Sequence, residues 1–252
     1  ILPEAYLDEP NCEEHIAKIH ENMTNYLKND LFNVYNDCFI LTTRTQADGR
    51  LRVGLVGAID LEMYDYNKGS KSQVRATEAT VAERIPPRVK IRMNAPLELP
   101  HIMILIDDVQ NTVIEPLLEK KLQTVYDFEL MQNGGHLNGS VVDGDSAREV
   151  LAALDKLADK NTFNRRYGLQ NEDVLLYAMG DGNHSLATAK ECYEQKKRTN
   201  SPDAELARYA LVEVVNLHST ALEFEAIHRV ITEVDTDDLM CKMTNSLGLT
   251  ED

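Results

Sequence analysis

Residues 174–190 read VLLYAMGDGNHSLATAK, and this stretch decides the fold class. The apolar run 174–179 predicts a buried strand, and the segment from about 186 to 197 predicts a helix. Between them, Gly180 and Gly182 lack a Cβ atom, so the backbone can turn tightly and come close to a ligand. A strand that passes directly into a helix is a building unit of proteins with parallel or mixed sheets.

Two β-hairpins are predicted upstream of this unit. Each joins two apolar runs through a short turn with Asp-Gly or Asn-Gly, the dipeptides that tight hairpins favour. The runs are 38–46 with 51–61, and 126–132 with 136–142. Short apolar runs predict further strands at 101–106, 210–217 and 227–234. Hairpins combined with a strand-to-helix unit predict an α+β (mixed α/β) class, with a mixed sheet and flanking helices.

Further helices are predicted where apolar residues recur at helical spacing. They lie at 12–29, at 112–122, from 145 onward and at 237–247. Asn11 followed by Glu14 predicts a capping box at the start of the first of them. Pro86 and Pro87 exclude one long helix between residues 64 and 100, because proline interrupts the hydrogen-bond ladder.

Composition restricts the function. The 252 residues include 42 acidic and 26 basic side chains, giving a net charge of −16, so a basic surface for nucleic acid is not expected. No apolar run reaches the ~18 residues of a membrane-spanning helix, so no membrane partner is expected. The four cysteines include no Cys-x-x-Cys pair, which argues against a zinc site or a redox dithiol and favours the cytoplasm.

The chain is interpreted as one mixed α/β unit over residues 1–252. It begins with Ile1 rather than Met, which favours a fragment of a longer protein. A subdivision into an N-terminal half, 1–125, and a C-terminal half, 126–252, stays open. The oligomeric state is not indicated by the sequence.

The segment Gly180-Asp-Gly-Asn-His-Ser185 is the first candidate site. A helix start carries a positive partial charge and attracts phosphate or carboxylate groups. His184, in the first turn, would tend to stay neutral there and could donate or accept a proton near neutral pH. In the structural alternative, Asp181 or Asn183 caps the helix and His184 packs against its neighbours.

The second candidate site combines Arg75-Ala-Thr-Glu-Ala-Thr80 with Arg84 and Arg88. Arginine side chains hold phosphate oxygens, and Glu78 could bind Mg²⁺ or accept a proton from a hydroxyl group. A solvated helix start capped by Thr77 is the structural alternative.

Two weaker candidates lie near other predicted strands. His228 and Arg229 could close an anion pocket, and His218 lies near the end of the strand 210–217, although isolated histidines near strands are more often structural. Asp107 and Asp108 could bind a metal ion, or they could cap the turn that follows their strand.

Four motifs resemble a bacterial family catalogued as domain of unknown function 1015, in its clostridial branch. They are residues 75–80, 83–90, 95–102 and 180–190. The family usually has Asp-Gly-His-His-Arg at 181–185 and a His-Glu-x-x-Thr or His-Glu-x-Thr motif around 77–80. The matching residues are Asp181, Gly182, His184, Glu78 and Thr80, and the departures are Asn183, Ser185 and Thr77. An arginine at position 185 would clamp phosphate, and Arg229, which matches the family's Thr-His-Arg, could replace it.

The Asp-Gly motif at a helix start is also similar to that of the ParB and sulfiredoxin-like superfamily. That superfamily includes nucleotide-dependent free-serine kinases and CTP-hydrolysing partition proteins. The similarity implies a ParB/sulfiredoxin-like core around the motif, with nucleotide phosphates at the helix start, although a shared fold does not fix the reaction. The acidity of the chain argues against a DNA-partition role.

These resemblances, with the residue chemistry, predict a phosphotransferase (kinase-like) or a nucleotide hydrolase acting on a small hydroxylated metabolite. The expected cofactors are Mg²⁺, on Asp181 and Glu78, and a nucleotide such as ATP, ADP or CTP. Glu78 would act as general base, with His184 and Asp181 as the other catalytic residues. The nucleotide phosphates would be bound by Gly180, Gly182, Asn183, Ser185, Arg75, Thr80, Arg84, His228 and Arg229.

Two alternatives stay open. A non-catalytic module could sense a nucleotide or small anion through the same residues. A scaffold protein could use the glycine-rich segment 180–182 merely to turn the chain.

Overall fold

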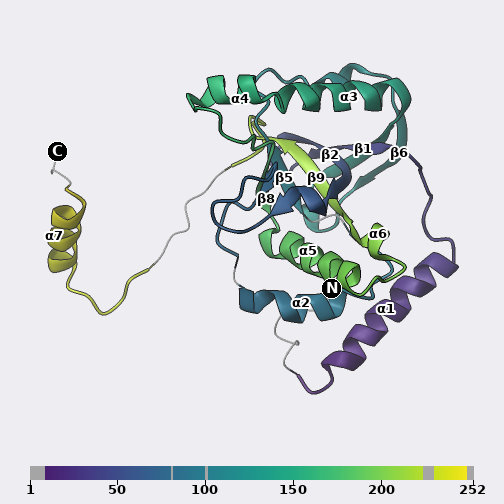
Figure 1. Ribbon diagram of the computed structural model, residues 1–252, viewed down its shortest axis with the longest axis horizontal. Helices are drawn as coiled ribbons and strands as arrows, with labels where there is room; N and C mark the ends of the chain where they lie inside the picture. Colours follow the sequence, from purple (N-terminus) through teal and green to yellow (C-terminus); the bar gives the residue numbers. More distant parts are fainter. Residues whose placement is uncertain (1–8, 81, 100–101, 224–229, 249–252) are drawn as a thin grey trace. The chain divides into compact units, whose positions relative to one another are not determined.

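The computed structural model describes residues 9–80, 82–99, 102–223 and 230–248. The chain divides into two compact units, residues 1–222 and 223–252 (Figure 1). The second unit contains α7 (Thr236–Leu247), which confirms the predicted helix at 237–247. Asp235 caps this helix by accepting hydrogen bonds from the amides of Asp237 and Asp238, both at 3.0 Å. Gly248 ends it with a left-handed φ of 64°.

The described residues of the first unit form one mixed sheet of nine strands, in the order β3-β4-β8-β5-β9-β2-β1-β7-β6. The strands are β1 (Phe39–Thr45), β2 (Leu51–Asp60), β3 (Tyr64–Asp65), β4 (Val74–Arg75), β5 (Met103–Ile106), β6 (Gln123–Glu129), β7 (His136–Val142), β8 (Tyr177–Asp181) and β9 (Tyr209–Asn216). The helices are α1 (Cys12–Lys28), α2 (Ile85–Arg92), α3 (Gly144–Leu157), α4 (Lys160–Tyr167), α5 (Asn183–Arg198) and α6 (Ala204–Ala207). The predicted α+β class with a mixed sheet is confirmed. In this sheet β5 lies between β8 and β9, so a strand from before residue 125 is flanked by two from after it.

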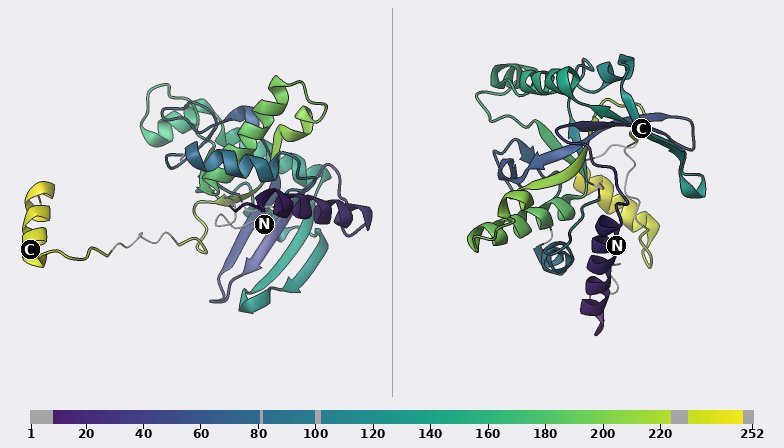
Figure 2. Two further views of the ribbon diagram at one scale, coloured as in Figure 1. Left: turned by 90° about the horizontal axis from the view of Figure 1, so that it is seen from below. Right: turned by 90° about the vertical axis from the view of Figure 1, so that its right-hand side faces the viewer.

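Both predicted hairpins are present. β1 and β2 pair antiparallel, as do β6 and β7, and β1 also pairs with β7, so the two hairpins join into one half of the sheet (Figure 2). Gly49, in the first turn, has a φ of 85°, and Gly135, in the second, has a φ of 91°. Both values lie in the left-handed region that glycine adopts without a steric penalty.

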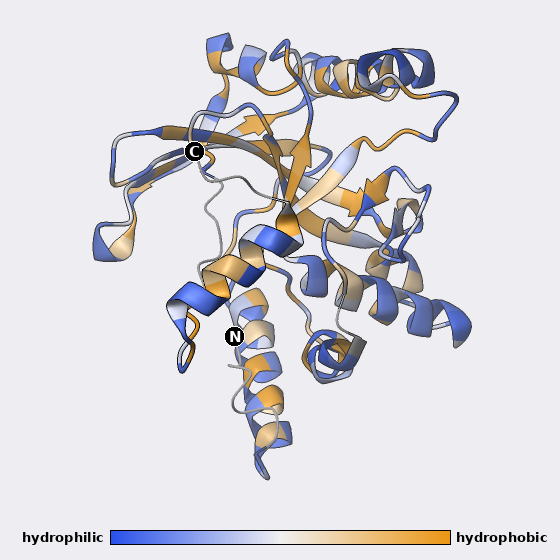
Figure 3. Ribbon diagram, turned by 90° about the vertical axis from the view of Figure 1, so that its left-hand side faces the viewer, coloured by the Kyte–Doolittle hydropathy of each residue, from blue (hydrophilic) through white to orange (hydrophobic). Residues whose placement is uncertain are grey.

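One face of the sheet carries the core. The register places five side chains in a row across five adjacent strands, and these are Leu41, Leu55, Val214, Ile104 and Met179. Apolar residues are concentrated on the strands (Figure 3). Since directly paired residues point to the same side of a sheet, this row forms a continuous apolar surface.

Two helices cover this face. α5 packs near one end of the strands, and α3 packs near the other end (Figure 1). α5 packs Leu186, Ala189 and Tyr193 against Ile104 and Met179. α3 packs against the other end, where its buried residues Val150 and Ala153 join a second core cluster with Leu41 and Leu55. The start of α5 is therefore held against the edge of the sheet where β8 ends.

Several local predictions are wrong. The segment 112–122 is not an α-helix and contains only a short 3-10 turn, Glu115–Glu119. Asn11 occupies the cap position of α1 without a side-chain cap, and its amide instead contacts His15, 3.0 Å away. Residues 230–234, the described part of the predicted strand 227–234, form no strand. The helices α2, α4 and α6 were not predicted.

No helix of the described ranges has the length and apolarity that crossing a membrane requires.

Candidate functional site

The turn between β8 and α5 begins with a β-bulge at Gly180. Ile104 of β5 pairs with Met179, and Met103 pairs with Asp181, so Gly180 is the extra residue. A Cβ atom at Gly180 would lie 3.0 Å from Cγ of Leu105, which is tighter than ordinary packing. A bulge redirects the side chains that follow it. Here Met179 stays in the core, whereas Gly180 and Asp181 are exposed at the sheet edge.

Gly182 begins α5 as its cap residue, with a left-handed φ of 88°. Its amide donates to Oδ1 of the preceding Asp181 at 2.7 Å, and its carbonyl accepts the first helical hydrogen bond, from Leu186, at 2.9 Å. Glycine has no side chain to cap the first turn as Ser or Asp would. The predicted capping of α5 by Asp181 or Asn183 is therefore wrong, and the positive end of the helix faces the edge of the sheet.

Thr77 ties the second candidate segment to this turn. Its Oγ1 donates to the carbonyl of Met179 at 2.8 Å, and its amide donates to Oδ1 of Asn183 at 3.3 Å. Asn183 is only 6% exposed, so its hydrogen bond attaches the segment around Thr77 to a buried side chain. β4, which precedes Thr77, runs parallel to β8 and ends at the same edge. The structure thus brings together two of the three predicted segments, and Thr77 links them rather than capping a helix.

The two residues predicted to supply carboxylates come at or just after strands that end at this shared edge. Glu78 follows Thr77 directly, and both Glu78 and Asp181 are exposed. Thr80 differs, because its Oγ1 is buried and has no hydrogen-bond partner among the described residues. His184 and Ser185 are partly buried in the first turn of α5, and Oγ1 of Thr188 donates to the carbonyl of His184 at 2.7 Å. Exposed acids beside a helix start could together hold a metal–phosphate complex.

The arginines predicted to hold phosphate lie in different parts of the fold. Arg75 donates from Nε to the carbonyl of Ser72 at 2.7 Å, and from Nη2 to those of Asp173 and Val174 at 2.9 and 3.2 Å. Its guanidinium group therefore braces the entry of β8, away from the motif. Arg84 is exposed just before α2, and its carbonyl accepts from Arg88 Nη1 at 2.8 Å. His228 and Arg229 lie outside the described residues.

The carboxylates at this edge are too few to coordinate Mg²⁺ by themselves, so they fit the ion only together with phosphate oxygens. Mg²⁺ is commonly held by one or two carboxylates together with substrate phosphates and water. Glu78 and Asp181 could provide the carboxylates. No group of three metal-binding His, Cys, Asp or Glu side chains occurs in the part of the chain that the structure describes. Phosphate and water oxygens would therefore complete the coordination.

A family model described as "Protein of unknown function (DUF1015)" matches residues 1–250. The chain belongs to the DUF1015 family. This match confirms the resemblance found from the four sequence motifs. The search of curated proteins and the search of solved structures each found no match. The likeness to ParB and sulfiredoxin proteins, and the clostridial branch, stay hypotheses.

A second polar cluster in this DUF1015 chain lies at the opposite edge of the sheet, where β5 and β9 end. Nε2 of His218 lies 2.6 Å from Oδ1 of Asp107, and Tyr167 donates a short hydrogen bond to Oδ2 of the same carboxylate. Arg166 lies 3.3 Å from that carboxylate. The adjoining hollow, of about 30 Å³, has room for roughly one water molecule. The cluster therefore serves mainly to join α4 to the sheet.

The neighbouring Asp108 resolves one of the alternatives left open by the sequence. It is 1% exposed and accepts hydrogen bonds from the amides of Thr112 and Val113, the latter at 2.8 Å. Asp108 therefore caps the following turn. Asp107 pairs with His218 rather than with a second carboxylate, so capping, and not a pair of metal ligands, is the alternative that fits.

The Asp107 cluster predicts acid-sensitive stability. Burial favours a higher pKa for Asp107, but the hydrogen bonds from Tyr167 and His218 and the charge of Arg166 outweigh it and lower the pKa below the ordinary value. Since the folded-state pKa lies below the unfolded one, this stabilisation is complete above the unfolded pKa of about 3.9 and disappears as the pH falls through the folded value.

Asp107→Asn should thus lower the free energy of unfolding by about 1 to 3 kcal/mol at neutral pH, because it removes a charged partner from three groups. Urea unfolding of both proteins at pH values from neutral to about 3 measures the difference. The gap between them should shrink in acid. A gap that stays constant would show that ionisation of Asp107 does not contribute.

Proposed function

We propose that this protein binds the phosphate groups of a nucleotide, or of another phosphorylated small molecule, at the start of α5. We further propose that it acts there as a Mg²⁺-dependent phosphotransferase or nucleotide hydrolase on a small hydroxylated metabolite. The observation that carries the proposal is the pair of hydrogen bonds from Thr77 to Met179 and Asn183, at 2.8 and 3.3 Å. They attach the acidic segment 77–80 to the helix start.

Phosphate recognition would rest on backbone and helix polarity. The first turn of α5 follows two glycines, so a phosphate can approach the main chain closely. This recognition is independent of the nucleotide base. Arg84 keeps the role of a clamp in the proposal, whereas Arg75 supports the strand pairing of β4 with β8.

Transfer would rest on the two carboxylates. Asp181 and Glu78 would hold Mg²⁺ against the phosphate oxygens, and the bound ion would neutralise charge that develops on the phosphoryl group. Glu78 would accept the proton of the attacking hydroxyl group or water molecule. His184, in the first turn of the same helix, would orient the attacking group or donate a proton to the leaving group.

The proposal is tested by incubating the full chain with Mg²⁺ and ATP, ADP or CTP, with and without serine as a hydroxylated acceptor. Thermal shift reports binding, and phosphate release or transfer reports turnover. We expect both signals with at least one nucleotide, and their loss in Asp181→Ala. A shift without turnover would support the non-catalytic sensing module instead. Silence in both assays would contradict the proposal.

A further inference from the structure

A hollow of about 310 Å³ lies at the other end of α5. It is bounded by the end of α2, the segment 93–98, α6 and the first residue of β9, Tyr209. Cys192 and Lys196 line it from α5, and Cys192 lies nine residues after the first residue of the helix, or ~13 Å along its axis. Its volume is in the range of small-molecule sites. The hollow is thus separate from the phosphate site proposed above.

Two ion pairs line this hollow. Nη1 of Arg92 lies 2.6 Å from Oε1 of Glu98, and Lys196 forms a short ion pair with Asp203. Three of these side chains are mostly buried, with exposed fractions of 26%, 24% and 16% for Arg92, Glu98 and Lys196. The hollow therefore carries two positive and two negative groups and no net charge.

The first ion pair is incompletely satisfied. Oε1 of Glu98 is buried, and although Arg92 lies close to it, no hydrogen bond with acceptable geometry reaches it. Oε1 itself is closed to a ligand, so a ligand's donor would reach the exposed part of this side chain, 24% of its surface.

The remaining lining is apolar. Met93, Pro96, Leu97, Leu206 and Ala207 contribute carbon surface, and Leu206 is 81% exposed. The thiol of Cys192 is 3% exposed, and burial raises its pKa to about 11, so it is neutral at physiological pH. A ligand that fits this lining needs an apolar part in addition to its charges.

We infer that this hollow binds a small zwitterion with an apolar side chain, in the manner of a free aliphatic α-amino acid. The ammonium group faces Glu98 and Asp203, and the carboxylate faces Arg92 and Lys196. A singly charged ligand would separate an ion pair and leave one buried charge without a partner, whereas a zwitterion offers each charge an opposite one. A polyanion such as a nucleotide is disfavoured, because a carboxylate already neutralises each cation.

The first test compares ligands on the unmodified full chain by isothermal titration calorimetry. The probes are leucine, leucine methyl ester, which lacks the carboxylate, and N-acetylleucine, which lacks the ammonium group. We expect leucine to bind in the millimolar range or tighter, and each derivative to bind about tenfold more weakly or worse. No heat from leucine at about 10 mM, or equal binding of all three, would overturn the inference.

The second test locates the bound leucine. Amide NMR spectra of the isotopically labelled full chain are recorded with increasing leucine. The largest shifts should occur at Cys192, Lys196 and the segment 93–98, which line the hollow. Asp203→Asn, whose side chain is 46% exposed, should weaken leucine binding, whereas Glu149→Gln, in an exposed ion pair on α3, should not. Shifts confined to other parts of the chain at saturating leucine would contradict the placement.

Discussion

Glu78→Gln is expected to lower the rate of phosphate transfer or release by about 10²- to 10⁴-fold, the range lost when a general base is removed. The amide retains the size of the carboxylate and one oxygen that could still face Mg²⁺, but it cannot accept a proton. Nucleotide affinity should change far less, because the helix start and Asp181 stay in place. The measurements are the rate of phosphate release at saturating nucleotide and the dissociation constant from calorimetry.

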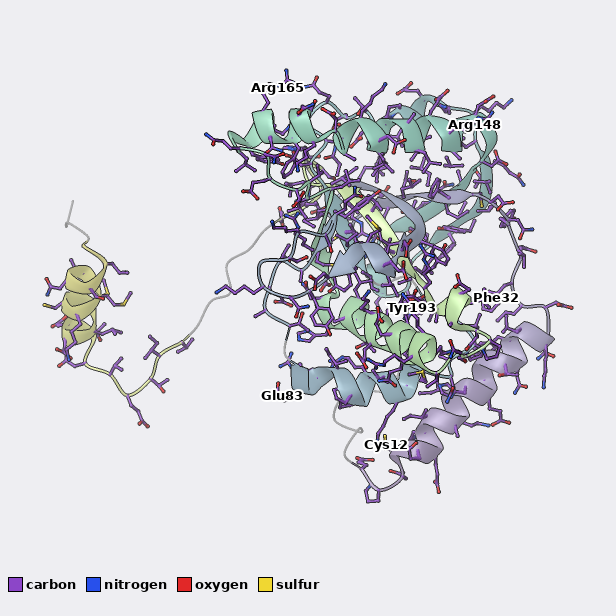
Figure 4. All side chains as sticks on the ribbon, viewed as in Figure 1. Cys12, Phe32, Glu83, Arg148, Arg165 and Tyr193 are labelled. Atoms are coloured by element: carbon purple, nitrogen blue, oxygen red, sulfur yellow. The ribbon has the colours of Figure 1, made fainter. Side chains whose placement is uncertain are left out.

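Glu83→Gln is the matched control for this prediction. Glu83 is also exposed and lies in the next short turn, Ala82–Arg84, just before α2 (Figure 4). It is not linked to α5 by Thr77. Its substitution should leave the rate within about twofold of the unmodified protein. Equal rates for Glu78→Gln and the unmodified protein would remove Glu78 from the mechanism, and equal losses in both variants would indicate a nonspecific effect of charge.

Gly135→Ala is expected to lower the free energy of unfolding by about 2 to 5 kcal/mol. Gly135 has a φ of 91°, and a Cβ atom there would lie 1.9 Å from the carbonyl oxygen of Thr45. The left-handed conformation and the collision with backbone both oppose alanine. Urea unfolding measures this change in the free energy of unfolding. The substitution should also reduce the cooperativity with which β6 and β7 unfold.

Gly49→Ala separates these two causes. Gly49 has a similar φ of 85°, but a Cβ atom there would meet nothing within 4 Å. Only the cost of the left-handed backbone conformation should remain, which is about 1 to 2 kcal/mol of the free energy of unfolding. If the two variants lost the same stability, the close approach of Thr45 to Gly135 would not contribute.

The hairpins could be predicted because their signals are local. The Asp-Gly and Asn-Gly turns lie between apolar runs, and β1, β2 and β7 fall within two residues of the expected bounds. The strand predicted for β8 began too early in the sequence. Its predicted apolar run began at Val174, but the strand begins at Tyr177, because the guanidinium of Arg75 binds the carbonyls of Asp173 and Val174.

The wrong helix at 112–122 has a tertiary cause. Its apolar residues recur at helical spacing. However, the buried carboxylate of Asp108 accepts hydrogen bonds from the amides of Thr112 and Val113, and these bonds hold the segment in a turn. Asn216 then donates to the carbonyl of Asp108 at 2.9 Å, from a strand 108 residues away in sequence. Periodicity does not report such contacts, so this segment could not be assigned from the sequence alone.

The order of strand, glycine turn and helix start at the candidate site was predictable from the sequence, but the attachment of segment 77–80 to it was not. The glycines and the helix start were recognised from the order of strand, turn and helix. The hydrogen bond between Thr77 and Met179 joins residues 102 positions apart, and Thr77 had been counted as a departure from the family pattern. The bond between His218 and Asp107 spans 111 positions. Neither leaves a signal in a single sequence.

In our proposal, the start of α5 and the attached segment 77–80 together receive a phosphoryl group. Amide NMR spectra of the isotopically labelled full chain, titrated with pyrophosphate and Mg²⁺, test it without any assumption about the nucleotide base. The largest shifts should occur at Gly182 to Ser185 and at Thr77 to Thr80. Shifts confined to other parts of the sheet, or none at saturating pyrophosphate, would contradict it.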